Sequence, residues 1–345
     1  CQVSEKRQLA ILIPAYNERQ VIARCVQSVL DAGMALEDVY VSDDGSRDGT
    51  ADHARQCGVS VVTHPNMGKA GAIRTGVEHF AICERYEWVS ILDADCEVAP
   101  SYFSALQDAI TRHPSVALIS GVEFSPRRNW LTAWRAVEHA IFGGVYREAQ
   151  HLTNSIIVVP GLCSTFRCAI FTTLQDHGTM IEDMDWTIQL HRRGEHVIFE
   201  PRAHVCAQQP ATIHDFLTQV QRWHVGTWQN IRLHRIGSHC QPVDVALSSM
   251  AIEAVVYAIA LVMLPAIWYG WGRQYVLWGF VIDQTLLGAY TGLVAIRERR
   301  MDVIRAFPLF SLPRVLNIGS FVWAFFATRR SSMVTSGAWV SPARY

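Results

Sequence analysis

The stretch "LAILIPAYNERQVIARCVQSVLDAG", residues 9–33, decides the fold. Its first eight residues are a short apolar run typical of a buried parallel strand, and the helical pattern after them ends at a glycine. The theme then repeats, with strands predicted within 38–46, 59–65 and 88–95 and helices over 50–58 and 69–84. This alternation predicts a mostly parallel, Rossmann-like α/β sheet, covered on both faces, up to about residue 205. In such sheets ligands bind at the carboxyl ends of the strands.

Composition narrows the class of protein. The 345 residues suit one large domain with an appendage, and 30 Lys+Arg against 31 Asp+Glu give no basic excess that would favour nucleic acid. The nine cysteines are scattered singly without a C-x-x-C pair, which favours reduced thiols facing the cytosol over disulfides or a zinc site. The polar opening "CQVSEKRQ" predicts no signal peptide.

From Val243 onward the chain becomes strongly apolar. The runs at 243–271, 275–296 and 307–327 are each long enough to cross a bilayer, although buried core helices are the alternative. Prolines and Arg314 interrupt the third run, so the alternative is that 301–313 lies along the interface and that the span begins near Arg314. An arginine cluster follows the second run, which predicts a multi-pass protein of the plasma membrane with its first half in the cytoplasm.

Charged residues gather in the loops that follow the predicted strands. "SDDGSRDGT" carries Asp43 and Asp44, "ILDADCE" carries Asp93 and Asp95, "MIEDMDWT" carries three acids, and "NMGKAG" places a lysine at a helix start. On an extended strand residues i and i+2 share a face, so both acids of "DAD" can point at one cation. Taken singly, these motifs are equally explained by turns, helix caps or an exposed lysine.

The ordered set of motifs resembles the membrane-embedded, processive branch of the family-two glycosyltransferases, which includes cellulose, chitin, hyaluronan and poly-N-acetylglucosamine synthases. The resemblance covers about residues 8–235. It rests on "IPAYNE" (13–18), "SDDGS" (42–46), "NMGKAGA" (66–72), "DAD" (93–95), "IEDMDW" (181–186) and "QVQRW" (219–223). The stretch from "EDMDW" to "VIFEPRA" is most similar to bacterial poly-N-acetylglucosamine synthases.

This resemblance implies a GT-A fold that uses a UDP-sugar with Mg²⁺ or Mn²⁺. The implied donor-binding residues match the first four motifs and the last: Ala15, Tyr16, Glu18, Asp44 with Asp43 as its alternate, Lys69, Asp93 and Arg222. The implied metal ligand is Asp95, with Asp93 beside the metal.

The catalytic side is implied in the same way. Asp183 matches the general base and Glu182 lies next to it. Direct displacement with a single base implies inversion, so that an α-linked donor gives a β-linkage. The implied acceptor contacts are Gln219 and Trp223. Within the same motif, the guanidinium of Arg222 suits a pyrophosphate and the indole of Trp223 suits a sugar ring. Gly161 and Cys163 of "VPGLCSTFR" are further acceptor candidates, with a plain turn as the alternative.

The expected organisation has four parts. A cytosolic GT-A domain (1–210) precedes an amphipathic interfacial region (211–242), about three transmembrane helices (243–330) and a tail (331–345). The expected partners are the UDP-sugar, a polysaccharide or glycan acceptor and membrane lipid. Family members commonly carry membrane helices before the catalytic domain, and none is expected here. Either the chain is trimmed, or a second copy or a partner subunit completes the channel, or the acceptor is a short lipid.

Three functions compete. The first is a processive, inverting polysaccharide synthase. The second is a non-processive transferase that adds one sugar to a lipid carrier or glycolipid, and the third is a binding subunit without turnover. The Q-x-x-R-W residues favour the first over the second, and the retained Asp95, Asp183 and Arg222 disfavour the third.

Overall fold

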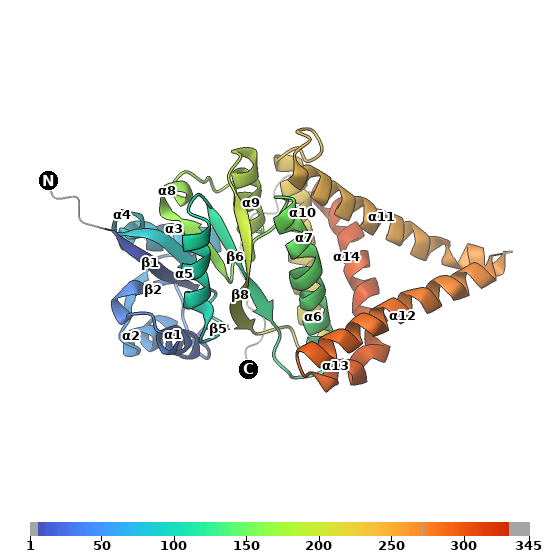
Figure 1. Ribbon diagram of the computed structural model, residues 1–345, viewed down its shortest axis with the longest axis horizontal. Coiled ribbons are helices and arrows are strands. Elements are labelled where there is room, and N and C mark those ends of the chain that lie inside the picture. The colour runs from blue at the N-terminus through green and yellow to red at the C-terminus, as the bar shows by residue number, and fades with distance from the viewer. Residues whose placement is uncertain (1–5, 271, 331–345) are drawn as a thin grey trace.

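A computed structural model describes residues 6–270 and 272–330 and builds the first part of the chain around one eight-stranded sheet (Figure 1). The strands are β1 (Arg7–Ala15), β2 (Val39–Asp43), β3 (Ser60–Thr63), β4 (Tyr86–Ile91), β5 (Cys96–Val98), β6 (Leu118–Phe124), β7 (Ser164–Arg167) and β8 (Val197–Ala207). Their order in the sheet is β3-β2-β1-β4-β7-β6-β8-β5. The predicted tail, 331–345, lies outside the described residues.

The sheet is mixed but mostly parallel, as the sequence predicts. Strands β3, β2, β1 and β4 run parallel, and β6 runs parallel to β8. Strand β7 is antiparallel to both β4 and β6, and β5 closes the edge antiparallel to β8. The carboxyl ends of β1, β2 and β4 therefore meet at one edge, where the acidic motifs follow them.

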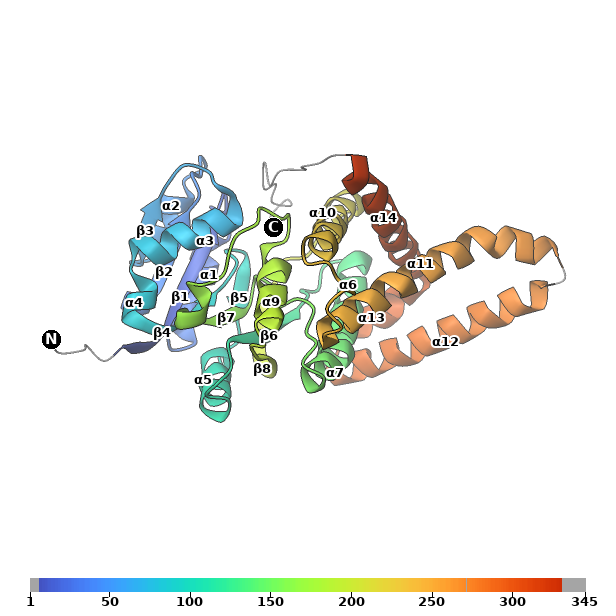
Figure 2. The ribbon, with the colours of Figure 1, turned by 90° about the horizontal axis from the view of Figure 1, so that it is seen from above.

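Helices cover both faces of the sheet, as Figures 1 and 2 show. Those of the first part are α1 (Ile22–Asp31), α2 (Thr50–Gln56), α3 (Gly68–His79), α4 (Ile82–Arg85), α5 (Tyr102–Arg112), α6 (Trp130–Ile141), α7 (Arg147–Leu152), α8 (Cys168–Phe171) and α9 (Glu182–Arg192). The alternation along β1 divides the core: Ile11 and Ile13 pack in one apolar cluster with Ile22 of α1, whereas Leu12 packs in the other with Ile73 of α3.

One predicted helix is interrupted. The pattern over 69–84 gives two helices, α3 and α4, because Ala81 adopts a left-handed conformation with φ of 49°. Phe80 ends α3 with its ring 4.7 Å from that of Tyr40 on β2. This aromatic contact packs the end of α3 against β2 before the chain turns toward β4.

The last third of the chain is helical. It comprises α10 (Ile213–Leu233), α11 (Pro242–Tyr269), α12 (Arg273–Arg297), α13 (Met301–Ala306) and α14 (Ser311–Arg330). Helices α11 and α12 reach away from the sheet and approach each other at a distant tip (Figure 1). Both are long and apolar enough to cross a membrane, and α13 with α14 form a third candidate bent by 63°. The bend falls between Leu309 and Ser311, close to the end of the stretch 301–313 for which the sequence offers an interfacial position as the alternative.

Helix α10 joins the two parts of the molecule. Thr212 caps its first turn by accepting a hydrogen bond from Asp215 N at 3.1 Å. Phe216 and Val220 are buried against α6, α12 and α13, and the Trp228 indole donates to Phe321 O of α14 at 3.1 Å. Trp228 therefore packs α10 against α14, and α10 lies between the sheet and the apolar helices.

Candidate functional site

The ends of β1 and β2 bring the first acidic motif to the edge of the sheet. Asp44 is fully buried and accepts hydrogen bonds from Met67 N at 2.6 Å and Gly68 N at 2.9 Å, at the start of α3. Burial raises the pKa of Asp44, and these two bonds offset only part of the rise. Both carboxylate oxygens of Asp43, by contrast, are buried and accept no hydrogen bond from the described residues. Asp43 therefore has the unused acceptors of the pair.

The remaining residues of the first motif flank this edge. Ala15 is buried at the end of β1 and its carbonyl accepts from Asp44 N at 2.8 Å, while Tyr16 beyond it is half-buried. Glu18 is buried, and its backbone N–H donates to Thr50 Oγ1 at 2.8 Å. The motif at residues 13–18 thus lies beside Asp43, at the carboxyl ends of the neighbouring strands β1 and β2.

The lysine at the start of α3 reaches across to two other loops. Lys69 Nζ lies 2.5 Å from Asp93 Oδ1, which follows β4, and 3.8 Å from Glu182 Oε1 of α9. Burial alone would lower the pKa of this ammonium, but the charges of Asp93 and Glu182 outweigh it and raise the pKa. A charged lysine therefore joins three segments that are distant in sequence.

The geometry predicted for "DAD" is wrong. Strand β4 ends at Ile91, and residues 93–95 form a turn before β5, so the two carboxylates do not share a strand face. The chain must turn here because β4 and β5 occupy distant positions in the sheet. Asp93 and Asp95 are both half-buried, and an all-oxygen pair of this kind fits a hard divalent cation such as Mg²⁺ or Mn²⁺.

Two acids lie in the first turn of α9. Asp183 Oδ2 accepts from Gly161 N at 3.0 Å and Oδ1 from Met184 N at 2.8 Å, which fixes the direction of the carboxylate. Burial raises the pKa of both Glu182 and Asp183, and the charges of Lys69 and Arg222 offset part of the rise. The raised pKa of Asp183 is the property expected of a general base that works near neutral pH.

The loop before β7 brings one acceptor candidate into the site and buries the other. A Cβ on Gly161 would lie 2.7 Å from Lys69 Nζ and 3.6 Å from Asp183 Oδ2, so the backbone passes close to both. Cys163 is fully buried beside Gly121, whose N–H donates to the Cys163 carbonyl at 3.0 Å. Burial raises the pKa of the Cys163 thiol to about 12. Gly161 joins the acids, whereas Cys163 packs beneath them.

The Q-x-x-R-W residues lie along the first half of α10. The Gln219 Oε1 atom is buried and accepts no hydrogen bond from the described residues. The Trp223 ring is half-buried, and the guanidinium of Arg135 on α6 lies 5.0 Å from its centroid. Arg222 acts electrostatically on both Glu182 and Asp183. The helix thus brings a cation toward the α9 acids and a tryptophan toward α6.

Sequence reasoning missed the residues that hold α10 against the loop before α9. Gln229 Oε1 accepts from Met180 N at 2.9 Å, and Asn230 Nδ2 donates to Ile181 O at 3.4 Å. A Cβ on Gly226 would lie 2.5 Å from Ile181 Cγ1, so the two segments are in close contact. The signal was present in the spacing: these residues follow Trp223 by three, six and seven positions and continue the same side of the helix.

Comparison with known proteins gives three findings. The Glycosyl transferase family 2 model matches residues 10–174. A poly-beta-1,6-N-acetyl-D-glucosamine synthase of Staphylococcus aureus (strain COL) is 25% identical over 235 residues, covering 65% of this chain and 55% of that protein. The corresponding synthase of Staphylococcus epidermidis is 23% identical over 277 residues, covering 75% and 66%. The chain thus spans between about half and two thirds of the length of these curated relatives.

The fold also has a solved counterpart. A mannosyltransferase, PcManGT from Pyrobaculum calidifontis, solved in complex with GDP-Man and Mn2+, superposes with a TM-score of 0.64 over 93% of this chain and 88% of its own. The two sequences are 18% identical, so the likeness concerns the fold. It extends beyond the region of the family match into the helical last third.

Proposed function

We propose that the chain, whose residues 10–174 match the Glycosyl transferase family 2 model, is a membrane synthase that transfers sugar from a UDP-sugar to a growing polysaccharide. The observation that carries the proposal is one convergence: Lys69 of α3 meets Asp93 after β4 and Glu182 of α9, beside Gly161 and Asp183. These segments are far apart in sequence, and a donor, a cation and a base are needed at one place for sugar transfer.

The donor is proposed to bind along the ends of β1, β2 and β4. Ala15, Tyr16 and Glu18 contact the nucleotide, and Asp43 accepts from the uracil ring with its unused oxygens. Asp44 then has the different task of holding the start of α3, and so the position of Lys69. In this arrangement Lys69 and Arg222 bring positive charge to the diphosphate as negative charge grows on the leaving group.

A divalent cation is proposed at the turn of residues 93–95. Asp95 would ligate it and Asp93 would lie beside it, and the oxygen donors fit Mg²⁺ or Mn²⁺. When bound, such an ion neutralises charge on the diphosphate. Lys69 Nζ, 2.5 Å from Asp93 Oδ1, orients that carboxylate.

Asp183 is proposed as the general base. Its carboxylate takes the proton of the acceptor hydroxyl while the hydroxyl oxygen bonds to the anomeric carbon and the bond to the diphosphate breaks. The N–H groups of Gly161 and Met184 keep the carboxylate aimed during this step. Attack opposite the leaving group inverts the anomeric centre, so an α-linked UDP-sugar gives a β-linked product.

The proposed product is inferred from the relatives, and the proposed location is inferred from the apolar helices. The staphylococcal synthases support N-acetylglucosamine as the sugar and a polymer as the product. Two or three helices could span a membrane, which supports a multi-pass plasma-membrane protein with its GT-A domain (1–210) in the cytoplasm. Residues 211–242 would lie at the interface and 243–330 would span. Trp223, Gln219 and Gly161 are proposed around the acceptor, with the buried Cys163 supporting their loop from beneath, and a second copy or a partner subunit would complete the path of the acceptor.

The test is product formation in membranes carrying the protein. UDP-GlcNAc, UDP-Glc and UDP-GlcA are each supplied with Mn²⁺ or Mg²⁺, and product length is read on a gel. A ladder from UDP-GlcNAc is expected, whereas single additions would establish the transferase to a lipid carrier instead. Asp183→Asn should abolish the ladder, and Asp108→Asn, an exposed acid on α5, should not. Polymer from the Asp183→Asn protein would refute the assigned base.

A further inference from the structure

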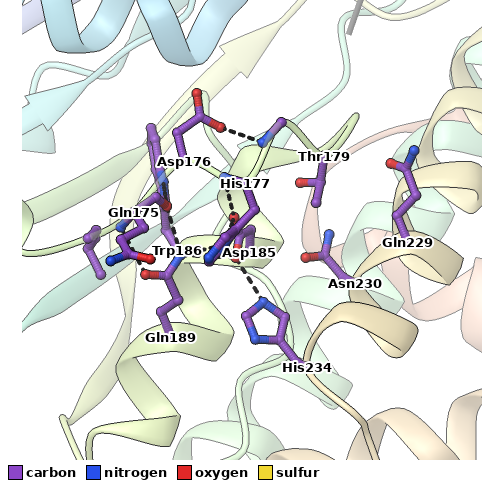
Figure 3. A network of polar contacts seen from close by, with 12 residues as sticks. Gln175, Asp176, His177, Thr179, Asp185, Trp186, Gln189, Gln229, Asn230 and His234 are labelled. Carbon is purple, nitrogen blue, oxygen red and sulfur yellow. Dashed lines mark hydrogen bonds and ion pairs between the residues drawn. The ribbon is translucent and has the colours of Figure 1, made fainter. Parts of the chain in front are cut away.

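A second cluster of ligating side chains lies outside the proposed catalytic site. His177 Nδ1, an Asp185 carboxylate oxygen and His234 Nε2 all lie within 4.8 Å of one another. The three residues come from the loop before α9, from α9 itself and from the residue that ends α10 (Figure 3). We propose that His177, Asp185 and His234 form a zinc-type metal site that ties this loop and α9 to the end of α10.

The carboxylate at the centre of the cluster is held for ligation. Asp185 is fully buried, with Oδ1 2.8 Å from His234 Nε2 and Oδ2 3.0 Å from His177 Nδ1. Gln189 Nε2, one turn along α9, donates to Oδ1 at 3.0 Å. This bond orients the carboxylate from behind, as residues around metal ligands commonly do. A buried carboxylate without such partners would be costly, so these partners are needed to hold Asp185 in its charged form.

The surroundings leave room for an exchangeable ligand. The His234 side chain is nearly buried, whereas that of His177 is 32% exposed, so the cluster opens to solvent on one side. Two imidazoles, one carboxylate and a water are the ligand set of many open zinc sites. Each imidazole then turns a lone pair to the ion instead of donating an N–H to Asp185. The metal-free alternative is a hydrogen-bonded His–Asp–His network.

The ligand chemistry separates this site from the donor site. Nitrogen-containing sets favour Zn²⁺, Co²⁺ or Ni²⁺, whereas the oxygens of Asp93 and Asp95 favour Mg²⁺ or Mn²⁺. Asp185 lies two residues after Asp183, and His177 lies in the loop that Gln229 and Asn230 also hold from α10 (Figure 3). A bound ion would therefore stiffen the segment that carries the base, without touching the sugar.

The test is a Co²⁺ titration of the detergent-purified, metal-stripped protein, because Co²⁺ in a tetrahedral nitrogen-containing site absorbs visibly. One equivalent is expected to bind and to be displaced by Zn²⁺. His177→Ala and His234→Ala should each weaken binding at least about 100-fold. His214→Ala, which removes an exposed histidine from the other end of α10, and Asp95→Asn should retain the signal.

Thermal unfolding gives a second reading. Zn²⁺ should raise the unfolding temperature of the wild-type protein and leave that of His177→Ala unchanged, since only a ligand that binds the folded state stabilises it. His177 lies on a loop and is partly exposed, so its variant is expected to fold even if His234→Ala does not. Absence of stoichiometric Co²⁺ binding to the wild type, or a signal that persists in both histidine variants, would show the metal-free network instead.

Discussion

Gly161 shows how one missing side chain shapes the site. A Cβ there would meet the flexible end of Lys69 at 2.7 Å, so Gly161→Ala should displace the ammonium and leave the fold intact. We expect the rate of sugar transfer to fall at least about tenfold, because a displaced Lys69 would stabilise the transition state less. A loss of about 1.4 kcal/mol is enough for a tenfold effect. The unfolding temperature should change little. Gly279→Ala, at a glycine of α12 with nothing within 4 Å and no left-handed φ, controls for the addition of a methyl group away from the site.

The raised pKa of Asp183 makes a prediction about pH. A general base must be ionised, so kcat/KM should fall as the pH drops through the pKa of Asp183, which burial places above its ordinary value of 3.8. Lys69 holds that pKa down from a still higher value. Lys69→Gln should therefore move the acid limb to higher pH as well as lower the rate, whereas Lys69→Arg should keep the limb near its original position. An acid limb that is the same in all three proteins would contradict the assignment.

At the scale of elements, the contact between α10 and the loop before α9 sets where the first turn of α9, and with it Asp183, lies. Gly226 allows the contact, because a Cβ there would lie 2.5 Å from Ile181 Cγ1 and 3.1 Å from Ile181 Cβ. Gly226→Ala should cost on the order of 1–3 kcal/mol of folding stability by overpacking and should reduce activity as α9 shifts. Gly319→Ala, in α14 with open space around it, is the matched control and should not lower the unfolding temperature, because alanine favours a helix over glycine.

These elements also mark the limit of prediction from sequence. The strand–helix alternation predicts β1 to β4 and α1 to α3, most clearly where an element such as β1 or α1 buries a continuous apolar face, which periodicity reveals. It does not reveal that β7 enters the sheet antiparallel between β4 and β6, because such pairing depends on long-range contacts. The acids of the site were predicted from local motifs. The cluster of His177, Asp185 and His234 was not, since its members meet only after α9 and α10 have packed.

At the scale of the whole molecule, α9 connects the chemistry to the apolar helices. Its first turn carries Asp183, and its last residue, Arg192, pairs with Asp244 at the start of α11 through two contacts of 2.6 and 2.7 Å. Asp244 is buried and also accepts from Gly237 N at 2.8 Å. Farther along, Asp283 of α12 pairs with Arg314 of α14 at 2.6 Å. Two acids within the apolar runs, Asp244 and Asp283, thus have arginine partners, one of which ties α11 to α9 and the other α12 to α14.

The attachment predicts which side of the membrane each part faces. Helix α11 has 28 residues and is about 42 Å long at the usual rise, which exceeds a hydrocarbon core of about 30 Å. The end of α11 and the start of α12 should therefore lie on the far side of the membrane. In intact cells a membrane-impermeant thiol reagent should label Gln274→Cys, which is exposed at the start of α12. Cys206 and Cys240, which are exposed in the part of the chain that the structure describes, should react only after permeabilisation, because the proposed orientation places both on the cytoplasmic side. Labelling of Cys206 in intact cells, or protection of the cysteine at 274, would overturn this orientation.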